Sequence, residues 1–257
     1  MKPSVKYSQA PISEVICGLT FSNSVFERNH AIYDIISSLK QEYPVLETLE
    51  PLADEFLEDY RLLTSISGQE GLFLQRLRKQ DNKWLAQIQS NKLYHNWIRR
   101  DNQLVGDYPG FTYIFNEFRK ILEKTISYTG VSVSDLHSQI KHYSLLYQDR
   151  VMWQDHIDDL AKIDKILKIS VPSISYATNN LYSRYTLPLI EIDGYADLRI
   201  NTGASTIEQN RQMLIIQVEI KSKAERFGID EWFKKAHELQ IDFFEQIFQP
   251  NILSQWK

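Results

Sequence analysis

Residues 212–248, QMLIIQVEIKSKAERFGIDEWFKKAHELQIDFFEQIF, place a strand directly before a helix, and this order decides the fold class. In the first part, Leu214, Ile216 and Val218 alternate with polar side chains, which is typical of a strand with one buried face. From Asp230, which we expect to cap the helix, apolar residues recur at helical spacing. The helical stripe comprises Trp232, Ala236, Leu239, Phe243 and Ile247, widened by Phe233, Phe244 and Phe248. A half-buried strand followed by an amphipathic helix predicts an α+β protein.

The same order of elements occurs twice along the chain: a strand, a helix, three strands and a closing helix. The first copy covers residues 12–128 and the second covers residues 137–248. We therefore predict two pseudo-repeated β-α-β-β-β-α halves, residues 1–130 and 131–257, whose antiparallel sheets pack on the long helices as one compact unit. Element order alone supports this duplication, because the halves share no residue-level repeat.

The individual elements follow from apolar periodicity and from turn residues. The expected helices cover residues 25–43, residues 108–125, a segment starting near Asp155, and residues 230–248. The expected strands cover residues 12–21, 56–66, 72–78, 84–90, 137–151, 173–186, 189–200 and 212–221.

Composition excludes several classes of function. The net charge of −4 and the pI near 5.9 argue against non-specific nucleic-acid binding, which needs clustered positive charge. Cys17 is the one cysteine and lies in an apolar run, so we expect a buried thiol, no intramolecular disulfide and a reducing compartment. Neither a signal peptide nor an apolar run of ~20 residues is found, so we expect a cytoplasmic protein without membrane contact.

His237 is the strongest single candidate for chemistry. It lies on the last expected helix, at the edge of the apolar face and beside Glu238. A histidine at this place is more often buried at a helix–sheet seam than catalytic, because a lone imidazole needs a nucleophile or base partner. The sequence shows no such partner for His237.

A metal site is a second candidate, drawn from His137, His142 and His156 together with Asp149 and Asp155. Metal ligands must converge on one point with fixed geometry. His137 and His142 are expected to point to opposite faces of a strand, and Asp155 is expected to cap a helix. The pattern therefore favours no metal, and we expect no cofactor, because P-loop, GxGxxG, CxxC, GxSxG and HExxH motifs are also missing.

Trp97, Arg99 and Arg100 form a third candidate, a contact for a nucleic acid or another partner. An aromatic ring beside two cations suits base stacking combined with phosphate contact. The alternative is a strand end with Trp97 in the core and a solvated arginine pair, and the acidic charge of the chain favours this alternative.

Three segments carry a resemblance to a known family. They are YSQAPISEVICGLTF at residues 7–21, IQSNKLYHNWIRRDNQLVGDYPGFTYIFNEFRKIL at residues 88–122, and AHELQIDFFEQIFQPNILSQW at residues 236–256. Together they resemble a sporadically distributed family of bacterial and archaeal proteins of about this length. The resemblance implies a cytoplasmic protein and no particular activity. Residues 141–144 read KHYS where relatives often have Arg-Tyr-x-Asn, which puts any family site on that strand in doubt.

We expect a non-enzymatic binding or sensor subunit. The resemblance associates it with a bacterial defence or toxin–antitoxin-like module and a protein partner encoded nearby. Exposed edge strands and aromatic surfaces also favour a homodimer. The alternative is a hydrolase or nucleic-acid-processing enzyme that uses His237 or the region between His137 and His156.

Overall fold

The computed structural model describes residues 7–22, 25–26, 31–50, 74–99, 107–168, 181–204 and 211–257. These residues form one nine-stranded sheet in the order β2-β3-β4-β5-β1-β6-β9-β8-β7, and every neighbouring pair is antiparallel. The strands are β1 (Ile12–Phe21), β2 (Val45–Leu49), β3 (Leu74–Arg78), β4 (Trp84–Gln89), β5 (Lys92–Ile98), β6 (Ile140–Val151), β7 (Tyr182–Leu189), β8 (Gly194–Ala204) and β9 (Gln212–Lys223). The helices are α1 (Ala31–Leu39), α2 (Phe111–Ile126), α3 (Val133–Gln139), α4 (Ile229–Ile247) and α5 (Pro250–Leu253).

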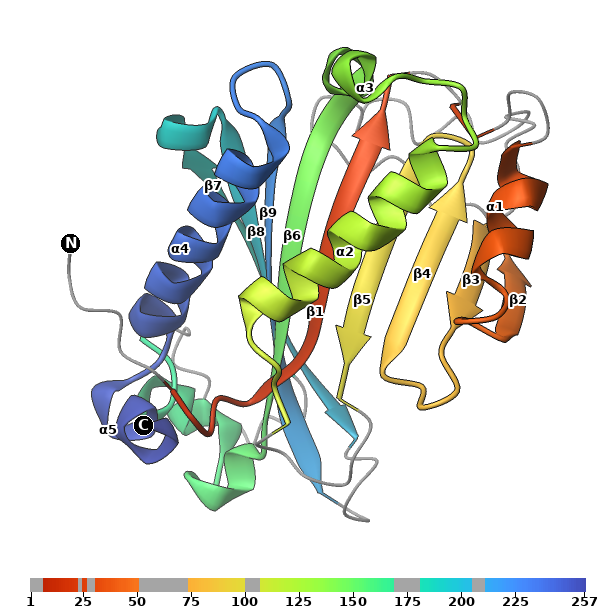
Figure 1. Cartoon of the computed structure of the whole chain (residues 1–257). Helices are drawn as coiled ribbons and strands as arrows, with labels where there is room; N and C mark the ends of the chain where they lie inside the picture. Colours follow the sequence, from red (N-terminus) through yellow and green to blue (C-terminus); the bar gives the residue numbers. More distant parts are fainter. Residues whose placement is uncertain are drawn as a thin grey trace.

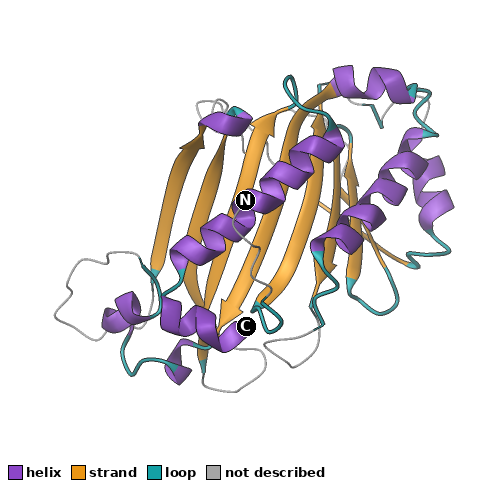
Figure 2. Ribbon diagram, turned by 60° about the vertical axis from the view of Figure 1, so that its left-hand side comes forward, coloured by secondary structure: helices purple, strands orange, loops and turns teal. Residues whose placement is uncertain are grey.

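The long helices α2 and α4 cover the same face of the sheet, and β2 and β7 form its two edges (Figures 1 and 2). The core lies between this face and the helices, because alternate residues of the central strands β1 and β6 point toward them. Val15, Cys17 and Leu19 on β1 are fully buried. Tyr143 and Leu145 on β6 are fully buried as well. The α+β class and the antiparallel arrangement are confirmed. The strands of both predicted halves belong to one continuous sheet and not to separate sheets.

The buried thiol of Cys17 is also confirmed. Burial raises the pKa of this thiol far above its ordinary value, because the thiolate would lose its hydration. Cys17 therefore acts as a small apolar side chain of the central strand.

The elements at residues 212–248 are confirmed by β9 and α4. Leu214, Ile216, Val218 and Ile220 are buried, as their alternation predicts. The predicted N-cap is wrong, because the N-cap of α4 is Gly228 and no side chain caps the helix. Asp230 lies in the first turn, where its charge suits the helix dipole.

The second half starts differently from the prediction. The strand expected from His137 begins at Ile140, and a short helix, α3, precedes it. Ser132 explains this difference, because its Oγ accepts a hydrogen bond from the Asp135 N–H at 3.1 Å, as a helix cap does. His137 therefore lies on a helix and not on the strand.

No long helix starts near Asp155. This part of the chain forms two 3-10 helices, Trp153–Asp155 and Leu160–Lys165, and Asp159 caps the second by accepting a hydrogen bond from the Ala161 N–H. Asp155 instead forms an ion pair with Arg211.

Other boundaries shift. The expected helix at residues 25–43 is seen as α1 at Ala31–Leu39, and β2 and β5 are strands that the sequence analysis did not predict. The expected strand at residues 56–66 lies outside the described residues. Among the described residues, no helix combines the length and the apolar character that crossing a membrane requires.

Candidate functional site

His237 lies at the seam where α4 meets the start of α2. Its Nδ1 is 3.1 Å from the hydroxyl of Tyr147 on β6, and its ring stacks on Phe111 of α2 with centroids 4.1 Å apart. The Tyr147 hydroxyl is also 3.0 Å from the hydroxyl of Tyr108, which precedes α2. His237, Tyr147 and Tyr108 therefore form a chain of polar groups, the histidine–tyrosine chain, between the helices and the sheet.

The electrostatics of this chain favour neutral groups. Burial lowers the pKa of His237 to about 4, so its imidazole is neutral at physiological pH. Burial also raises the pKa of Tyr147 well above its ordinary value, and Tyr108 adds to this shift. A general base needs a pKa near the working pH, and a tyrosine nucleophile needs a lowered one. Neither condition is met, so the histidine–tyrosine chain is suited to packing.

Asp149 lies near the end of β6, opposite Ile12 of β1. Burial raises the pKa of its carboxyl to about 7, and the nearby Arg99 only partly opposes this effect. One carboxyl oxygen, Oδ1, is buried and has no hydrogen-bond partner among the residues that the structure describes. A buried carboxyl with a shifted pKa marks a candidate site. We find no second reactive group bonded to Asp149 in the described part of the chain, so we do not assign catalysis to it.

The five residues of the possible metal site do not converge. His142 lies near the start of β6 and Asp149 near its end, while Asp155 and His156 follow the strand. A strand rises about 3.3 Å per residue, so His142 and His156 are separated by roughly the length of β6. Within the described residues, no group of three or more His, Cys, Asp or Glu side chains could hold a metal ion.

Trp97 and Arg99 are buried together at the end of β5. Trp97 is 2% exposed and makes an edge contact with Tyr108, with ring centroids 5.6 Å apart. The expected solvated arginine pair is wrong for Arg99, which is 6% exposed and donates a hydrogen bond to the carbonyl of Ala10 at 3.3 Å. Arg100 lies outside the described residues. The placement of Trp97 in the core leaves its ring no room to stack on a base.

His95 on β5 forms a second buried histidine–tyrosine pair, which the sequence analysis missed. Its Nε2 is 2.9 Å from the hydroxyl of Tyr43, and its ring stacks on Trp84 with centroids 5.4 Å apart. Burial, together with the nearby charge of Lys79, lowers the pKa of His95 to about 3. No motif announces this pair, because Tyr43 and His95 are 52 residues apart in the sequence.

The outer edge of β7 carries exposed apolar side chains. Tyr182 is 70% exposed, and Tyr185 and Leu187 are each 38% exposed. Tyr185 and Leu187 lie opposite Leu198 and Ala196 of β8, which point into the core, so both lie on the helix-covered side of the sheet. No described strand pairs with this edge. We call this surface, defined by Tyr182–Leu189, the β7 edge.

The backbone of the β7 edge offers hydrogen-bonding groups. The Thr202 N–H donates to the Leu181 carbonyl at 3.0 Å, so residue 181 points its backbone groups toward β8. Antiparallel pairing alternates, so Tyr182, Arg184, Thr186 and Pro188 point theirs away from β8. Pro188 lacks an N–H group and therefore loses no bond at this position. Edge strands with such groups accept an additional strand.

A charge network stabilises the other face of β7. Arg184 makes two hydrogen bonds of 2.8 Å to Asp197 on β8, and Arg199 donates to the same carboxylate at 2.6 Å. Arg199 also lies 3.7 Å from Glu219 on β9. Burial opposes ionisation of Asp197, but the bonds from the two arginines outweigh it and lower its pKa. The network holds β7, β8 and β9 in register.

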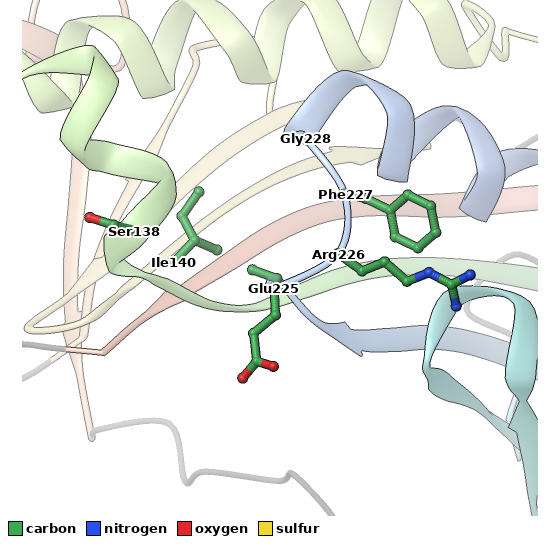
Figure 3. A pocket seen from close by; sticks show the side chains of 7 residues that line it. Ser138, Ile140, Glu225, Arg226, Phe227 and Gly228 are labelled. Carbon is green, nitrogen blue, oxygen red and sulfur yellow. The ribbon is translucent and has the colours of Figure 1, made fainter.

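A depression of about 570 Å³ lies where the chain enters α4 (Figure 3). Its lining comprises Ser138, Ile140, Ala224, Glu225, Arg226, Phe227 and Gly228. The guanidinium of Arg226 and the ammonium of Lys235 each lie 5.4 Å from the centre of the Phe227 ring. These contacts occupy the aromatic face, and the hydroxyl of Ser138 donates a hydrogen bond to the carbonyl of Asp135 at 2.7 Å.

Comparison with known proteins gives no further guide: no family model, no curated protein and no solved structure matches the chain.

Proposed function

We propose that this protein is a non-enzymatic binding subunit that recognises a protein partner through the β7 edge. The observation that carries the proposal is the exposed apolar side of β7, where Tyr185 and Leu187 extend the core surface beyond α4 beside backbone groups that point away from β8. Such a strand edge binds an extended segment by backbone hydrogen bonds, and apolar side chains add affinity.

The alternative, a hydrolase or nucleic-acid-processing enzyme, needs His237 beside an open cleft and a carboxylate. His237 instead contacts Phe111 and the hydroxyl of Tyr147. The region between His137 and His156 offers the alternative no support either, since β6 separates its two ends. The contacts of His237 therefore favour binding over catalysis.

The biological setting follows from the family resemblance. The proposal places the chain in the cytoplasm, as a binding or sensor subunit of a bacterial defence or toxin–antitoxin-like module whose partner is encoded nearby.

The proposal also includes an internal duplication of the β-α-β-β-β-α pattern. Its support is the strand order, in which the first strand of each half lies beside the last strand of the same half: β1 beside β5, and β6 beside β9. The two first strands, β1 and β6, pair with each other at the centre.

A strand-edge variant tests the proposed function. Thr186→Pro removes an outward N–H of the β7 edge without removing a bond to β8. The tagged chain and this variant are each cross-linked in cells of the source organism and purified. We expect a protein partner that the variant recovers at least ~10-fold less well. Leu46→Lys, at an exposed position of the opposite edge strand β2, is the matched control and should recover the partner normally. Equal recovery by all three proteins would reject the β7 edge as the binding surface.

A further inference from the structure

We infer that the partner of the β7 edge is a second copy of this chain, which pairs antiparallel with β7 around a two-fold axis at Tyr185. The inference rests on the proposed function, since it names the occupant of the same surface. It follows from the self-complementarity of the strand in one particular register. Three registers are to be compared, those that place Arg184, Tyr185 or Thr186 opposite its own copy.

The register centred on Arg184 opposes two guanidinium groups. Residues directly opposite each other in an antiparallel pair lie about 4.5–5.5 Å apart, and like charges at this spacing are destabilising. Arg184 shares the carboxylate of Asp197 with Arg199, so this register would bring two such arginine-containing networks side by side. This register is therefore disfavoured.

The register centred on Thr186 places Arg184 opposite Pro188 of the other copy. Pro188 has no N–H, so one hydrogen bond is lost on each side of the axis. The next outward positions would pair Tyr182 with Ile190, which lies in the 3-10 helix Ile190–Ile192 and not on the strand. This register makes about four backbone hydrogen bonds.

The register centred on Tyr185 satisfies the edge best. Arg184 then lies opposite Thr186 of the other copy, and both have outward backbone groups, which gives about four hydrogen bonds. Tyr182 lies opposite Pro188 and donates to its carbonyl, which adds about two more. No like charges are opposed, and the missing N–H of Pro188 costs least at the end of the pairing.

The side chains fit this register as well. Tyr185 lies beside its own copy, and Leu187 lies beside Ser183 of the other copy, all on the helix-covered side of the sheet. The exposed side chains of Tyr185 and Leu187 from both copies thus form one apolar stripe across the axis. Aromatic cross-strand pairs of this kind stabilise antiparallel sheets.

The oligomeric state tests the inference first. Sedimentation of the full chain over a range of concentrations should show a monomer–dimer equilibrium. Tyr185→Lys, which opposes two ammonium groups at the axis, should weaken the dimer at least ~10-fold. Leu46→Lys on β2 is the matched control and should dimerise like the original chain. The circular dichroism spectrum and thermal midpoint of each variant show that it is folded.

Cross-linking tests the register. Cys17 is buried, so Tyr185→Cys introduces an accessible thiol. Its copies would lie about 4.5 Å apart between Cα atoms, a spacing that a disulfide spans. Mild oxidation should therefore give a covalent dimer. Ser183→Cys, on the same face of the same strand, is the control, because its copies are separated by about four residues along the strand and should not cross-link.

A chain that stays monomeric at every concentration would overturn the inference, as would equal cross-linking of the two cysteine variants. If a monomeric chain captures a different protein and loses it with Thr186→Pro, the inference fails but the proposed function stands. If the chain is monomeric and no capture depends on β7, both fail.

Discussion

Two histidines, His95 on β5 and His237 on α4, are each bonded to a tyrosine, but they are buried to different degrees. His95 is completely buried between Tyr43 and Trp84, and its Nδ1 has no hydrogen-bond partner among the described residues. His237 lies at the seam of α2 and α4 and is only partly buried. Burial nevertheless lowers both pKa values, so the same pairing serves packing twice and neither imidazole is prepared for proton transfer at neutral pH.

The two edge strands of the sheet, β2 and β7, differ in where their charged side chains bind. On β2 the central residue Glu47 forms ion pairs with Arg76 and Arg78 of the neighbouring strand, at 3.8 and 3.4 Å. On β7 the charged residue, Arg184, binds Asp197, and tyrosine and leucine side chains are exposed on the other side. Both edges expose apolar side chains, but β2 has five residues and β7 has eight, and short charged edges resist strand addition better than longer ones. This difference is the reason why the proposed binding surface is β7 and not β2.

The largest difference between the halves is expected at two glycines. At Gly194 an added Cβ would meet the backbone carbonyl of Lys221, whereas at Gly18 it would meet the ring of Tyr94. The backbone of the β8–β9 ladder cannot move away without breaking its hydrogen bonds, but a side chain can turn. We expect Gly194→Ala to lower the free energy of unfolding by about 3 kcal/mol and Gly18→Ala by about 1 kcal/mol. Urea unfolding measures both, and a larger loss at Gly18 would contradict this account.

The second largest effect on the free energy of unfolding is expected from the buried carboxyl of Asp149, at the junction of the halves. The pKa of Asp149 is about 7 in the folded chain and 3.8 in its ordinary state, so its contribution to stability is present below pH 3.8 and is lost as pH rises toward 7. Asp149→Asn should therefore stabilise the protein at pH 8 by about 2–4 kcal/mol.

The control for Asp149→Asn is a second measurement of urea unfolding at low pH. At pH 3.5 both carboxyl and amide are neutral, so the variant and the original chain should unfold at nearly equal urea concentrations. A variant that is destabilised at pH 8 would mean that the attraction between Asp149 and Arg99 outweighs burial.

The local sequence pattern was sufficient to predict those helices and strands whose apolar periodicity agrees with the burial of their side chains. The hairpin of β3 and β4, the strand β9 and the helices α2 and α4 could be predicted for this reason. It was insufficient where a cap competes with periodicity, as Ser132 does at the start of α3. It also failed at residues 153–165, whose apolar spacing suits a helix although they form 3-10 turns.

The candidate site was predictable only in part, because its contacts are distant in sequence. The position of His237 at the edge of the apolar face follows from helical spacing. Its partner Tyr147 is 90 residues away in the chain, and nothing in either segment indicates the other. The burial of Arg99 depends likewise on Ala10, which β-sheet pairing brings close. The β7 edge could not be predicted, because recognising β7 as an edge strand requires the order of strands in the sheet.

Acid should destabilise both halves through their histidines. Each pKa lies below the ordinary value of 6.5, so the contribution is complete above pH 6.5 and is lost as pH falls toward the folded value. Each histidine should cost about 2 kcal/mol between pH 6.5 and pH 5. His95→Gln and His237→Gln should each flatten this part of the curve, measured by urea unfolding at a series of pH values. The stability contributions of the two histidines should differ only below pH 4, because His237 becomes protonated in the folded chain before His95 does.

The smallest expected difference concerns the two tyrosine hydroxyls. Tyr43→Phe would leave the Nε2 of the completely buried His95 without a partner, which should cost about 2 kcal/mol because water cannot replace the lost bond. Tyr147→Phe removes bonds to both His237 and Tyr108, yet His237 is partly exposed and water can reach it, so we expect about 1 kcal/mol. Urea unfolding at pH 7.5, with each histidine neutral, compares the two. The double variants Tyr43→Phe/His95→Gln and Tyr147→Phe/His237→Gln show how much of each loss belongs to the pair. Equal losses would mean that the seam between α2 and α4 excludes water as completely as the core around His95.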